Sequence, residues 1–507
     1  MTPENAIALA VALPLAGALL IVLCDRRPNL RETVTLATAV LLFATVASLV
    51  STVTAGGRPD LVLVELFPGL PLRLTVEPLG MLFALIASGL WIVTSIYSIG
   101  YMRANNEHKQ TRFYACFAIA LAATMGVAFA GNMLTLFVFY EALTLSTYPL
   151  VIHHETPEAL RAGRTYLGIL IGTSIGLLLL GMIATWSIAG TLDFQQGGIL
   201  TGKTSDAVVG LLLLLYVFGI GKAALMPIHR WLPAAMVAPT PVSALLHAVA
   251  VVKAGVFAVV KVMVYIFGID LLSGLTARTW LIYIAGATIL IASIIALRQD
   301  NLKLRLAYST ISQLSYVILG AALANGWGVI GGSMHIAMHA LGKITLFFCA
   351  GAIYTAAHKT KVSELDGIGR VMPFTMFAFF LGSLSVIGLP PFGGSWSKWY
   401  LALGAADAGY MVIVAVLMIS SLLNVAYLLP VVGRAFFLPP SEAEAATAPA
   451  HAGSVGAAAG GQPKDPGGLR EAPILCVVAL MVTAVGSFVV FFFADRIYDL
   501  LSPLVLR

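Results

Sequence analysis

Apolar stretches of roughly twenty residues alternate with short polar segments along most of the chain. A helix needs about 20 apolar residues to cross the hydrocarbon core of a bilayer, so each stretch has the length of a membrane span. Proline and glycine interrupt the seventh and twelfth stretches, which we predict to be discontinuous helices. The pattern predicts an all-α integral membrane protein of about fourteen transmembrane helices, with apolar runs near 5–24, 33–53, 79–100, 113–130, 132–152, 166–189, 207–230, 241–267, 279–297, 307–324, 328–357, 373–400, 409–433 and 472–494.

The composition agrees with a membrane protein and excludes several other classes. Of the 507 residues, 59% are hydrophobic and only 10% are charged, whereas a soluble domain has about 25% charged residues. The net charge of +6 is spread over short segments and does not form the basic stripe of a nucleic-acid-binding protein. The four cysteines form no metal-ligand or CxxC spacing, and nucleotide, haem and iron–sulfur motifs are absent. We therefore expect contact with lipid, and no metal, organic cofactor or nucleic acid.

Basic residues in the connecting segments indicate how the chain is oriented. If the N-terminus lies outside, the inner segments carry 18 lysines and arginines and the outer segments carry 6. Because basic residues favour the cytoplasmic side, we predict both termini on the outer side. Residues 1–24 lack a basic n-region, which is typical of a first membrane helix and not of a cleaved signal peptide. We expect a multi-pass protein of the bacterial inner (cytoplasmic) membrane with periplasmic termini.

A weak internal repeat divides the chain. Lys222 and Pro227 in the seventh span recur as Lys398 after Pro390 and Pro391 in the twelfth. Paired spans that proline or glycine interrupts are typical of inverted repeats in transporters. The predicted units are helices 1–3 at 1–112, a first repeat of helices 4–8 at 113–267, a second repeat of helices 9–13 at 279–434, a low-complexity cytoplasmic loop at 435–471, and helix 14 with its tail at 472–507.

Few ionisable side chains lie within the predicted spans. Glu141 is the only acid among them, beside five lysines. A charged side chain at the centre of a bilayer costs roughly 2.5–3.5 kcal/mol on insertion scales, so such residues mark ion paths or paired sites. Because an isolated carboxylate in hydrocarbon takes up a proton, we expect Glu141 to pair with Lys222. This pair is either a switchable part of transport or a static salt bridge. The lysines are Lys222, Lys253, Lys261, Lys343 and Lys398.

A row of histidines and a lysine occupies the eleventh span. His335, His339 and Lys343 follow one another at i, i+4 and i+8, so they share one helix face over about 12 Å. Imidazole titrates near neutrality, which suits a proton relay, whereas the other interpretation is hydrogen-bonded core histidines. A zinc site is disfavoured because no carboxylate stands nearby. Ser309 and Ser312 in the tenth span either hold water between charged groups or join helices.

Two lysines follow a histidine in the eighth span. Lys253 comes six residues after His247, so the two side chains do not share a helix face. Lys261 lies two turns beyond Lys253, toward the outer end. It either continues the ion path or extends to the headgroups and stabilises the helix end.

Several of these segments resemble one membrane-protein family. The proton-translocating membrane subunits of respiratory complex I and the Mrp-type cation/proton antiporters share a signature that matches Lys222, Pro227, Trp231-Leu232-Pro233, Pro239-Thr240-Pro241-Val242-Ser243-Ala244, His247 and Lys253-Ala254-Gly255-Val256. Glu141, the His335–Lys343 row, and the segment with Ser309 and Ser312 also match family positions. The resemblance covers roughly residues 80–435, and it implies the inverted repeats and the two broken helices.

Lys398 separates the relatives within this family. Lysine in the broken twelfth helix is found in the antiporter D-type subunit and in the distal complex I subunit, whereas the middle complex I subunit has glutamate. The distal subunit normally continues into further C-terminal helices that this chain lacks. The resemblance therefore favours the Mrp D subunit, a transporter subunit and not an enzyme, which exchanges Na⁺ for protons with other integral membrane subunits.

The resemblance also implies a route for the protons. They would pass from the Glu141–Lys222 pair through Lys253 and the His335–Lys343 row to Lys398, which would exchange with the outer face. One alternative is a proton-pumping subunit of an NADH–quinone or hydrogenase-type complex, where redox chemistry in other subunits drives transport. Another alternative, from a different class, is a scaffold subunit that transports nothing.

Overall fold

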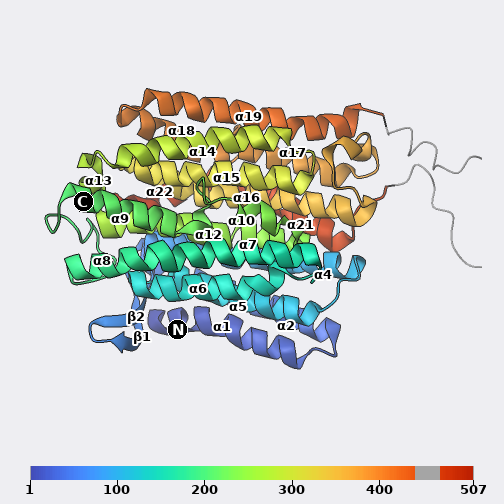
Figure 1. The fold of residues 1–507 in the computed structure, drawn as a ribbon. Coiled ribbons are helices and arrows are strands. Elements are labelled where there is room, and N and C mark those ends of the chain that lie inside the picture. Colours follow the sequence, from blue (N-terminus) through green and yellow to red (C-terminus); the bar gives the residue numbers. More distant parts are fainter. Residues whose placement is uncertain (1, 440–468, 506–507) are drawn as a thin grey trace, which may run out of the picture.

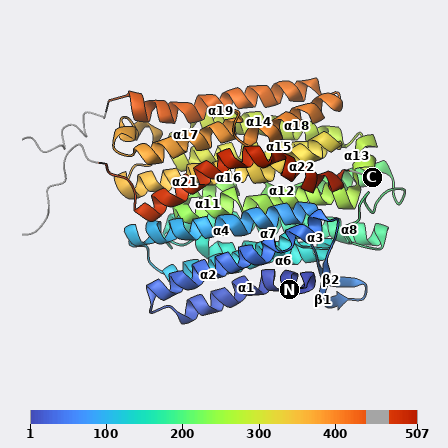
Figure 2. The same ribbon diagram turned by 180° about the vertical axis from the view of Figure 1, so that it is seen from behind.

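The computed structural model describes residues 2–439 and 469–505, and it is a bundle of long, nearly parallel helices (Figure 1). Both termini lie at the end of the bundle that carries the only β-hairpin of the described chain (Figures 1 and 2). The last helix of the second predicted repeat ends, and the C-terminal helix begins, at the opposite end. Both termini therefore lie at the same end of the bundle, as the loop-charge analysis requires. Which end faces outside stays a prediction.

The N-terminal region combines helices with a hairpin. It comprises α1 (Pro3–Leu23), α2 (Pro28–Ala47), α3 (Val50–Thr54), the antiparallel strands β1 (Asp60–Phe67) and β2 (Leu70–Thr75), and α4 (Pro78–Ala104). Proline stands in the first turn of α1, α2 and α4, where its missing N–H costs no helical hydrogen bond. The hairpin was not predicted, because it lies between the second and third apolar runs, outside the predicted spans.

The middle of the chain covers the region predicted as the first repeat, and the repeat itself stays a prediction. Its elements are α5 (Gln110–Ala128), α6 (Met133–Val151), α7 (Pro157–Thr173), α8 (Leu179–Ala189), α9 (Asp206–Gly219), α10 (Trp231–Ala234), α11 (Thr240–Ala248), α12 (Val251–Val262) and α13 (Ile269–Gly274). A π-helical turn at Ser174–Leu178 joins α7 to α8, and another at Met263–Phe267 follows α12.

The C-terminal part covers the region predicted as the second repeat and the predicted C-terminal helix. Its elements are α14 (Arg278–Arg298), α15 (Leu302–Ala322), α16 (Gly326–Ala357), α17 (Pro373–Ile387), α18 (Gly394–Asp407), α19 (Met411–Phe437), α21 (Ile474–Val489) and α22 (Ala494–Leu501). Asn325 caps α16 by accepting a hydrogen bond from Gly328 N at 2.9 Å, and the helix ends where His358 adopts a left-handed conformation.

The predicted all-α membrane fold is confirmed. Within residues 2–439 and 469–505, ten helical segments are long and apolar enough to cross a membrane, and each predicted apolar run contains helix. The seventh and twelfth runs are broken as expected, between α9 and α10 and between α17 and α18. The eighth run is also broken, between α11 and α12, where neither proline nor glycine gave a signal. The total of fourteen spans stays a prediction.

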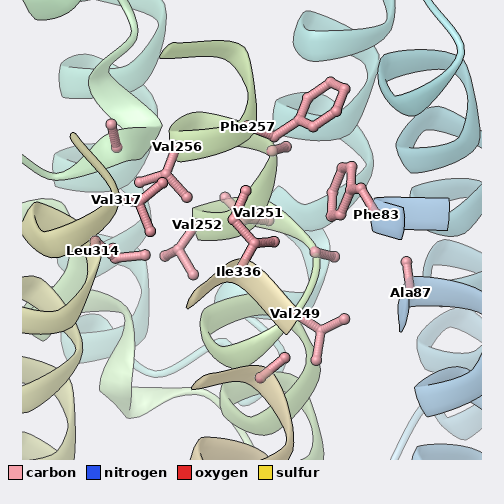
Figure 3. Packing of buried hydrophobic residues seen from close by; sticks show 14 of the residues in the cluster. Phe83, Ala87, Val249, Val251, Val252, Val256, Phe257, Leu314, Val317 and Ile336 are labelled. Atoms are coloured by element: carbon pink, nitrogen blue, oxygen red, sulfur yellow. The ribbon is translucent and has the colours of Figure 1, made fainter. Parts of the chain in front are cut away.

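Helix α16 forms the centre of the bundle (Figures 1 and 2). It is apolar on nearly all sides, and 94% of the residues in its most apolar 18-residue stretch are buried, as expected of a helix surrounded by others. Figure 3 shows Val251, Val252 and Val256 of α12 packed against α15 and α16, beside Leu314, Val317 and Ile336. On the other side of α12, the Phe257 ring packs against the Phe83 ring of α4. The charged side chains described below are therefore held in a tightly packed apolar core.

Candidate functional site

Lys222 occupies the break in the seventh span. Helix α9 ends at Gly219, and a short 3₁₀ turn, Gly221–Ala223, carries the lysine. The Gly221 carbonyl accepts a hydrogen bond from Ala224 N within the turn at 3.1 Å and another from the Trp231 indole at 3.0 Å. A Cβ at Gly255 of α12 would lie 2.3 Å from the Lys222 carbonyl carbon, so glycine lets α12 contact this turn directly.

The Lys222 ammonium is fully buried and is held by α6. Its Nζ donates to the Tyr140 carbonyl at 2.8 Å and to Thr144 Oγ1 at 2.6 Å, and it lies 3.1 Å from the centroid of the Tyr140 ring. Two oxygen acceptors and an aromatic face together stabilise a cation away from water. The site is therefore built for a charged lysine in a dry surrounding.

The predicted direct ion pair between Glu141 and Lys222 is not formed. Among the described residues, Glu141 has no partner within ion-pair distance, and its buried Oε1 lacks a hydrogen bond. Tyr140 and Thr144 share one face of α6, whereas Glu141 is rotated by about 100° from Tyr140. The ammonium therefore meets the neighbouring face, and Glu141 acts on it only as a nearby charge.

Lys253 and His339 connect the two halves of the chain. Lys253 Nζ of α12 and His339 Nδ1 of α16 are in hydrogen-bond contact at 2.8 Å, and both side chains are buried. The other ring nitrogen of His339, Nε2, has no partner in the described chain. An unpaired nitrogen in a dry core is available to bind or release a proton.

His335 continues the row from His339 along α16. The two rings are stacked with centroids 5.5 Å apart. His335 Nε2 lies 3.0 Å from Gln313 Oε1, and His335 Nδ1 lies 2.8 Å from Ser397 Oγ. The predicted row on one face of α16 is thus present, and Ser397 leads from it to α18, the helix that carries Lys398.

Lys343 lies on α16 one turn beyond His339, on the side away from His335, and it faces Ser309. Its Nζ donates to Ser309 Oγ at 2.7 Å, and the Tyr427 hydroxyl donates to the same oxygen at 2.8 Å. Ser312 points elsewhere, since its hydroxyl lies 3.0 Å from Ser293 Oγ of α14. Of the two predicted roles, Ser309 therefore belongs with the charged groups, whereas Ser312 joins helices.

Lys398 lies beyond the break in the twelfth span. Its Nζ donates to the Ile387 carbonyl, freed at the end of α17, at 2.8 Å, and to Ser421 Oγ at 3.2 Å. Pro390 and Pro391 fall within the interruption, as Pro227 does in the seventh span. Lys398 also borders an apolar cavity of about 760 Å³ between α18 and α19. The two breaks thus present their lysines in the same way, each bound to backbone and hydroxyl oxygens.

Lys261 has an acidic partner that was not predicted. Its Nζ lies 2.7 Å from Glu77 Oε1 and donates to the Ala130 carbonyl at 2.6 Å. The side chain is buried, so of the alternatives left open for it, extension to the headgroups does not hold. Glu141 is also not the only acid within a helix of the bundle, because the buried Glu32 lies inside α2 and pairs with Arg103. Both acids were missed because they stand just before the apolar runs, and the structure folds them inward.

His247 was the remaining predicted residue of this group. Its backbone belongs to α11, but its side chain lies outside the part of the chain that the structure describes. Most of the low-complexity loop predicted at 435–471 also falls on residues 440–468, outside the described ranges.

This row of buried lysines and histidines can be compared with known proteins. Residues 130–424 match the model of the family described as NADH:quinone oxidoreductase/Mrp antiporter, TM. The chain belongs to this family. NADH-quinone oxidoreductase subunit N of Desulforudis audaxviator is 33% identical to it over 437 residues, which cover 84% of this chain and 83% of that protein. NADH-quinone oxidoreductase subunit L of Mycobacterium tuberculosis is 32% identical over 416 residues, which cover 79% of this chain and 64% of that protein.

Solved structures share the fold of this NADH:quinone oxidoreductase/Mrp antiporter chain. A chain in the Mrp complex from Dietzia sp. DQ12-45-1b aligns with a TM-score of 0.86 and 24% identity, over 100% of this chain and 97% of that one. A chain of the membrane-bound sulfane sulfur reductase, an archaeal respiratory membrane complex, aligns with a TM-score of 0.83 and 24% identity, over 99% of each. The family resemblance predicted from the motifs is therefore confirmed, and the protein is a multi-pass integral membrane protein.

The chain has a further polar site, at the end of the bundle opposite its termini. A cavity of about 760 Å³ is lined there by Glu107, His154 and Lys303, among others. Burial alone would raise the pKa of Glu107, but hydrogen bonds from His153 and His154 outweigh burial and lower that pKa to about 2. The same contact with Glu107 raises the pKa of His154. These groups were missed because they stand in loops, where charged residues are ordinary.

Proposed function

We propose that this chain is the proton-translocating membrane subunit of a multisubunit monovalent cation (Na⁺)/proton antiporter, of the Mrp D type. The observation that carries the proposal is the contact between Lys253 of α12 and His339 of α16. It joins a buried cation of the first predicted repeat to a titratable ring of the second, in a core where a charge without a role would be costly.

Protons are passed along a row of titratable groups at the middle of the bundle. Lys222, with Glu141 beside it, stands at one end of the row, and Lys398 stands at the other. Lys253, His335, His339 and Lys343 lie between them, each with a hydrogen-bond partner. Because like charges repel strongly in a dry core, a proton gained at one centre promotes the loss of a proton from the next.

The proposal also assigns sides and partners. The cavity with Glu107 and His154 collects protons from the cytoplasm, and the termini lie on the periplasmic side, as the 18-to-6 distribution of basic residues favours. The proposed repeats at 113–267 and 279–434 each carry a lysine at a helix break that contains proline, Lys222 in the seventh span and Lys398 in the twelfth. Other integral membrane subunits complete the antiporter, and the relation in fold to chains of two multisubunit complexes supports such an assembly.

The second candidate function is a proton-pumping subunit of an NADH–quinone or hydrogenase-type complex. It is favoured by the 33% identity to a subunit N, which extends over 83% of that relative. In this case redox chemistry in neighbouring subunits drives the same row of lysines and histidines. The subunits that copurify with the chain distinguish the two functions: small antiporter subunits support the first, whereas iron–sulfur and flavin subunits support the second.

Transport by charge-deleted variants tests the shared part of both functions. Glu141→Ala and Lys222→Ala are each expected to abolish proton transport in everted vesicles while the complex still assembles. Lys203→Ala and Glu65→Ala are matched controls, because both side chains are exposed. If Glu141→Ala and Lys222→Ala transport protons at the wild-type rate, the buried charges are structural and the row is not the path. A silent scaffold subunit would give that same result.

A further inference from the structure

A small polar cavity lies at the hairpin end of the bundle, away from the row of lysines and histidines. Its volume is about 310 Å³. The end of β2, the turn between α5 and α6, and the segment after α8 enclose it. Its charged and polar lining is Arg58, Asp60, Arg73, Thr75, Glu77, Asp193, Gln195 and Lys261. None of these residues has a part in the proposed row.

The inner wall of this cavity is the Glu77–Lys261 ion pair. The carboxylate and ammonium are 2.7 Å apart, and the two side chains are only 6% and 1% exposed. The ammonium also contacts the Ala130 carbonyl at 2.6 Å and lies 4.7 Å from the centroid of the Phe194 ring. Glu77 Oε1, buried as it is, has no well-aligned hydrogen bond among the described groups. The pair is therefore buried in protein on one side and faces a polar space on the other.

The backbone around the cavity is firmly joined. Thr75 N donates to the Phe129 carbonyl at 2.6 Å, and Gly131 N donates to the Arg73 carbonyl at 2.8 Å. Arg73 Nε donates to Asp60 Oδ1 at 2.6 Å across the hairpin. A Cβ at Gly131 would lie 2.5 Å from Thr75 Oγ1, so glycine is needed where the turn meets the strand. The cavity is thus a built feature and not a gap between mobile loops.

Lys261 stands on the same helix as the central Lys253. The two lysines are eight residues apart, which places them about 12 Å apart along α12 and on nearly the same face. Phe257 lies between them on α12, and its ring centroid is 5.4 Å from Lys261 Nζ. The Phe257 and Phe83 ring centroids are 4.9 Å apart (Figure 3). An aromatic pair at this point excludes water between the central lysine and the cavity.

We propose that Glu77 and Lys261 form an outer-face port through which the first repeat exchanges protons with the aqueous phase at the hairpin end, and that Phe83 and Phe257 close the way to Lys253. A proton leaving the Lys261 ammonium passes to the Glu77 carboxylate and then to water in the cavity. The neutral lysine takes a proton from Lys253 when the aromatic pair moves apart. This port rests on the proposed function, because it requires Lys253 to carry protons.

Cysteine labelling tests the access that the port requires. In a chain whose native cysteines are replaced, Lys261→Cys is expected to react with a membrane-impermeant thiol reagent added on the side where Glu65→Cys, in the exposed hairpin, reacts. Lys253→Cys is expected not to react from that side. Lys261→Cys protein that assembles and stays unlabelled while Glu65→Cys is labelled would overturn the port. This measurement requires no transport activity.

Transport by variants of the pair tests its role. Glu77→Gln and Lys261→Met are expected to lower proton transport about 100-fold, the contribution typical of a positioned proton-transfer group. Glu65→Gln and Lys203→Met are the matched controls, because both residues are exposed. The double variant Glu77→Gln/Lys261→Met removes both charges, so that neither is left buried and unpaired. Assembly of all three variants on a native gel excludes misfolding. Wild-type transport by Glu77→Gln, with Lys222→Ala inactive, overturns the port, whereas an active Lys222→Ala shows that the proposed function itself has failed.

Discussion

Lys253 Nζ and His339 Nδ1 lie 2.8 Å apart, and this contact bridges α12 and α16 in the middle of the bundle. Both side chains are at most 2% exposed. A lysine that donates to a neutral imidazole keeps its charge partly compensated without a carboxylate. Because Nδ1 accepts from the lysine, Nε2 carries the hydrogen of the neutral ring, and it has no partner among the described groups. The ring can therefore take a proton from the lysine at Nδ1 and release the one on Nε2.

The first prediction separates the relay from mere packing. His339→Gln keeps a side-chain oxygen that accepts a hydrogen bond from Lys253, but an amide does not titrate. If His339 relays protons, transport in proteoliposomes falls about 100-fold while the complex assembles normally. His108→Gln, at an exposed loop histidine, is the control. Wild-type transport by His339→Gln would mean that the ring only fills space.

The second prediction concerns the Thr144 hydroxyl, which accepts a hydrogen bond from Lys222 at 2.6 Å. Hydrogen bonds to charged groups contribute about 1.5–3 kcal/mol, so Thr144→Val is expected to slow transport about tenfold or more. Thr124→Val is the matched control, because the buried Thr124 hydroxyl bonds only the Ala120 carbonyl of its own helix. Equal transport rates for the two variants would show that the Thr144 contact has no part in holding the lysine for transport.

The third prediction is a pH window for the contact between Glu107 and His154. The pKa of His154 is raised above its usual 6.5, so its contribution to stability is complete below pH 6.5 and is lost as the pH rises through the raised pKa. The pKa of Glu107 is lowered from 4.5 to about 2, so its contribution is complete above pH 4.5 and is lost as the pH falls toward 2. The pair is therefore fully charged between these two limits.

Thermal unfolding of His154→Gln tests this window. The pair is partly exposed, so we expect the variant to lose only about 0.2–1 kcal/mol of stability. The loss should be larger at about pH 5.5 than at about pH 8.5, whereas His108→Gln should show no such difference. A loss in His154→Gln that is the same at both pH values would show that the contact is not an ion pair.

The sequence predicts the helices well because apolar runs of span length have few other structures available in lipid. The breaks in the seventh and twelfth spans were predictable from Pro227, Pro390 and Pro391. The break between α11 and α12 was not, because residues 249–250 include neither proline nor glycine, and tertiary packing decides their conformation. The hairpin at 60–75 was missed because it lies outside the spans.

The candidate site could be predicted in its residues but not in its partners. Spacing on α16 placed His335, His339 and Lys343 on one face, and the structure agrees. The predicted partner of Lys222 was wrong. Charge alone favoured Glu141, whereas the face of α6 that meets the ammonium carries Tyr140 and Thr144. Which face of α6 meets the broken helix depends on packing between elements about 80 residues apart, which no local pattern encodes.

The last prediction concerns Lys398. A proton relay and a charge that only locks the helix predict opposite orders of transport activity among its variants. Its ammonium donates to the Ile387 carbonyl at 2.8 Å and to Ser421 Oγ at 3.2 Å, and an arginine could form similar hydrogen bonds. Guanidinium stays charged in proteins, so Lys398→Arg keeps the positive charge but releases no proton. If Lys398 exchanges protons, Lys398→Arg loses transport about 100-fold, as Lys398→Ala does, with the complex intact on a native gel.

Histidine at this position gives the complementary result. Because imidazole titrates near neutrality, Lys398→His is expected to retain partial transport, with its optimum shifted toward acid pH. Lys203→Arg and Lys203→His, at an exposed lysine of the hairpin end, control for the substitutions themselves. A helix-locking charge predicts that arginine is tolerated best and histidine poorly, since only a permanent cation would hold the freed Ile387 carbonyl at every pH. Transport rates measured across pH for the three Lys398 variants therefore decide between the roles, and an active Lys398→Arg protein would exclude the relay.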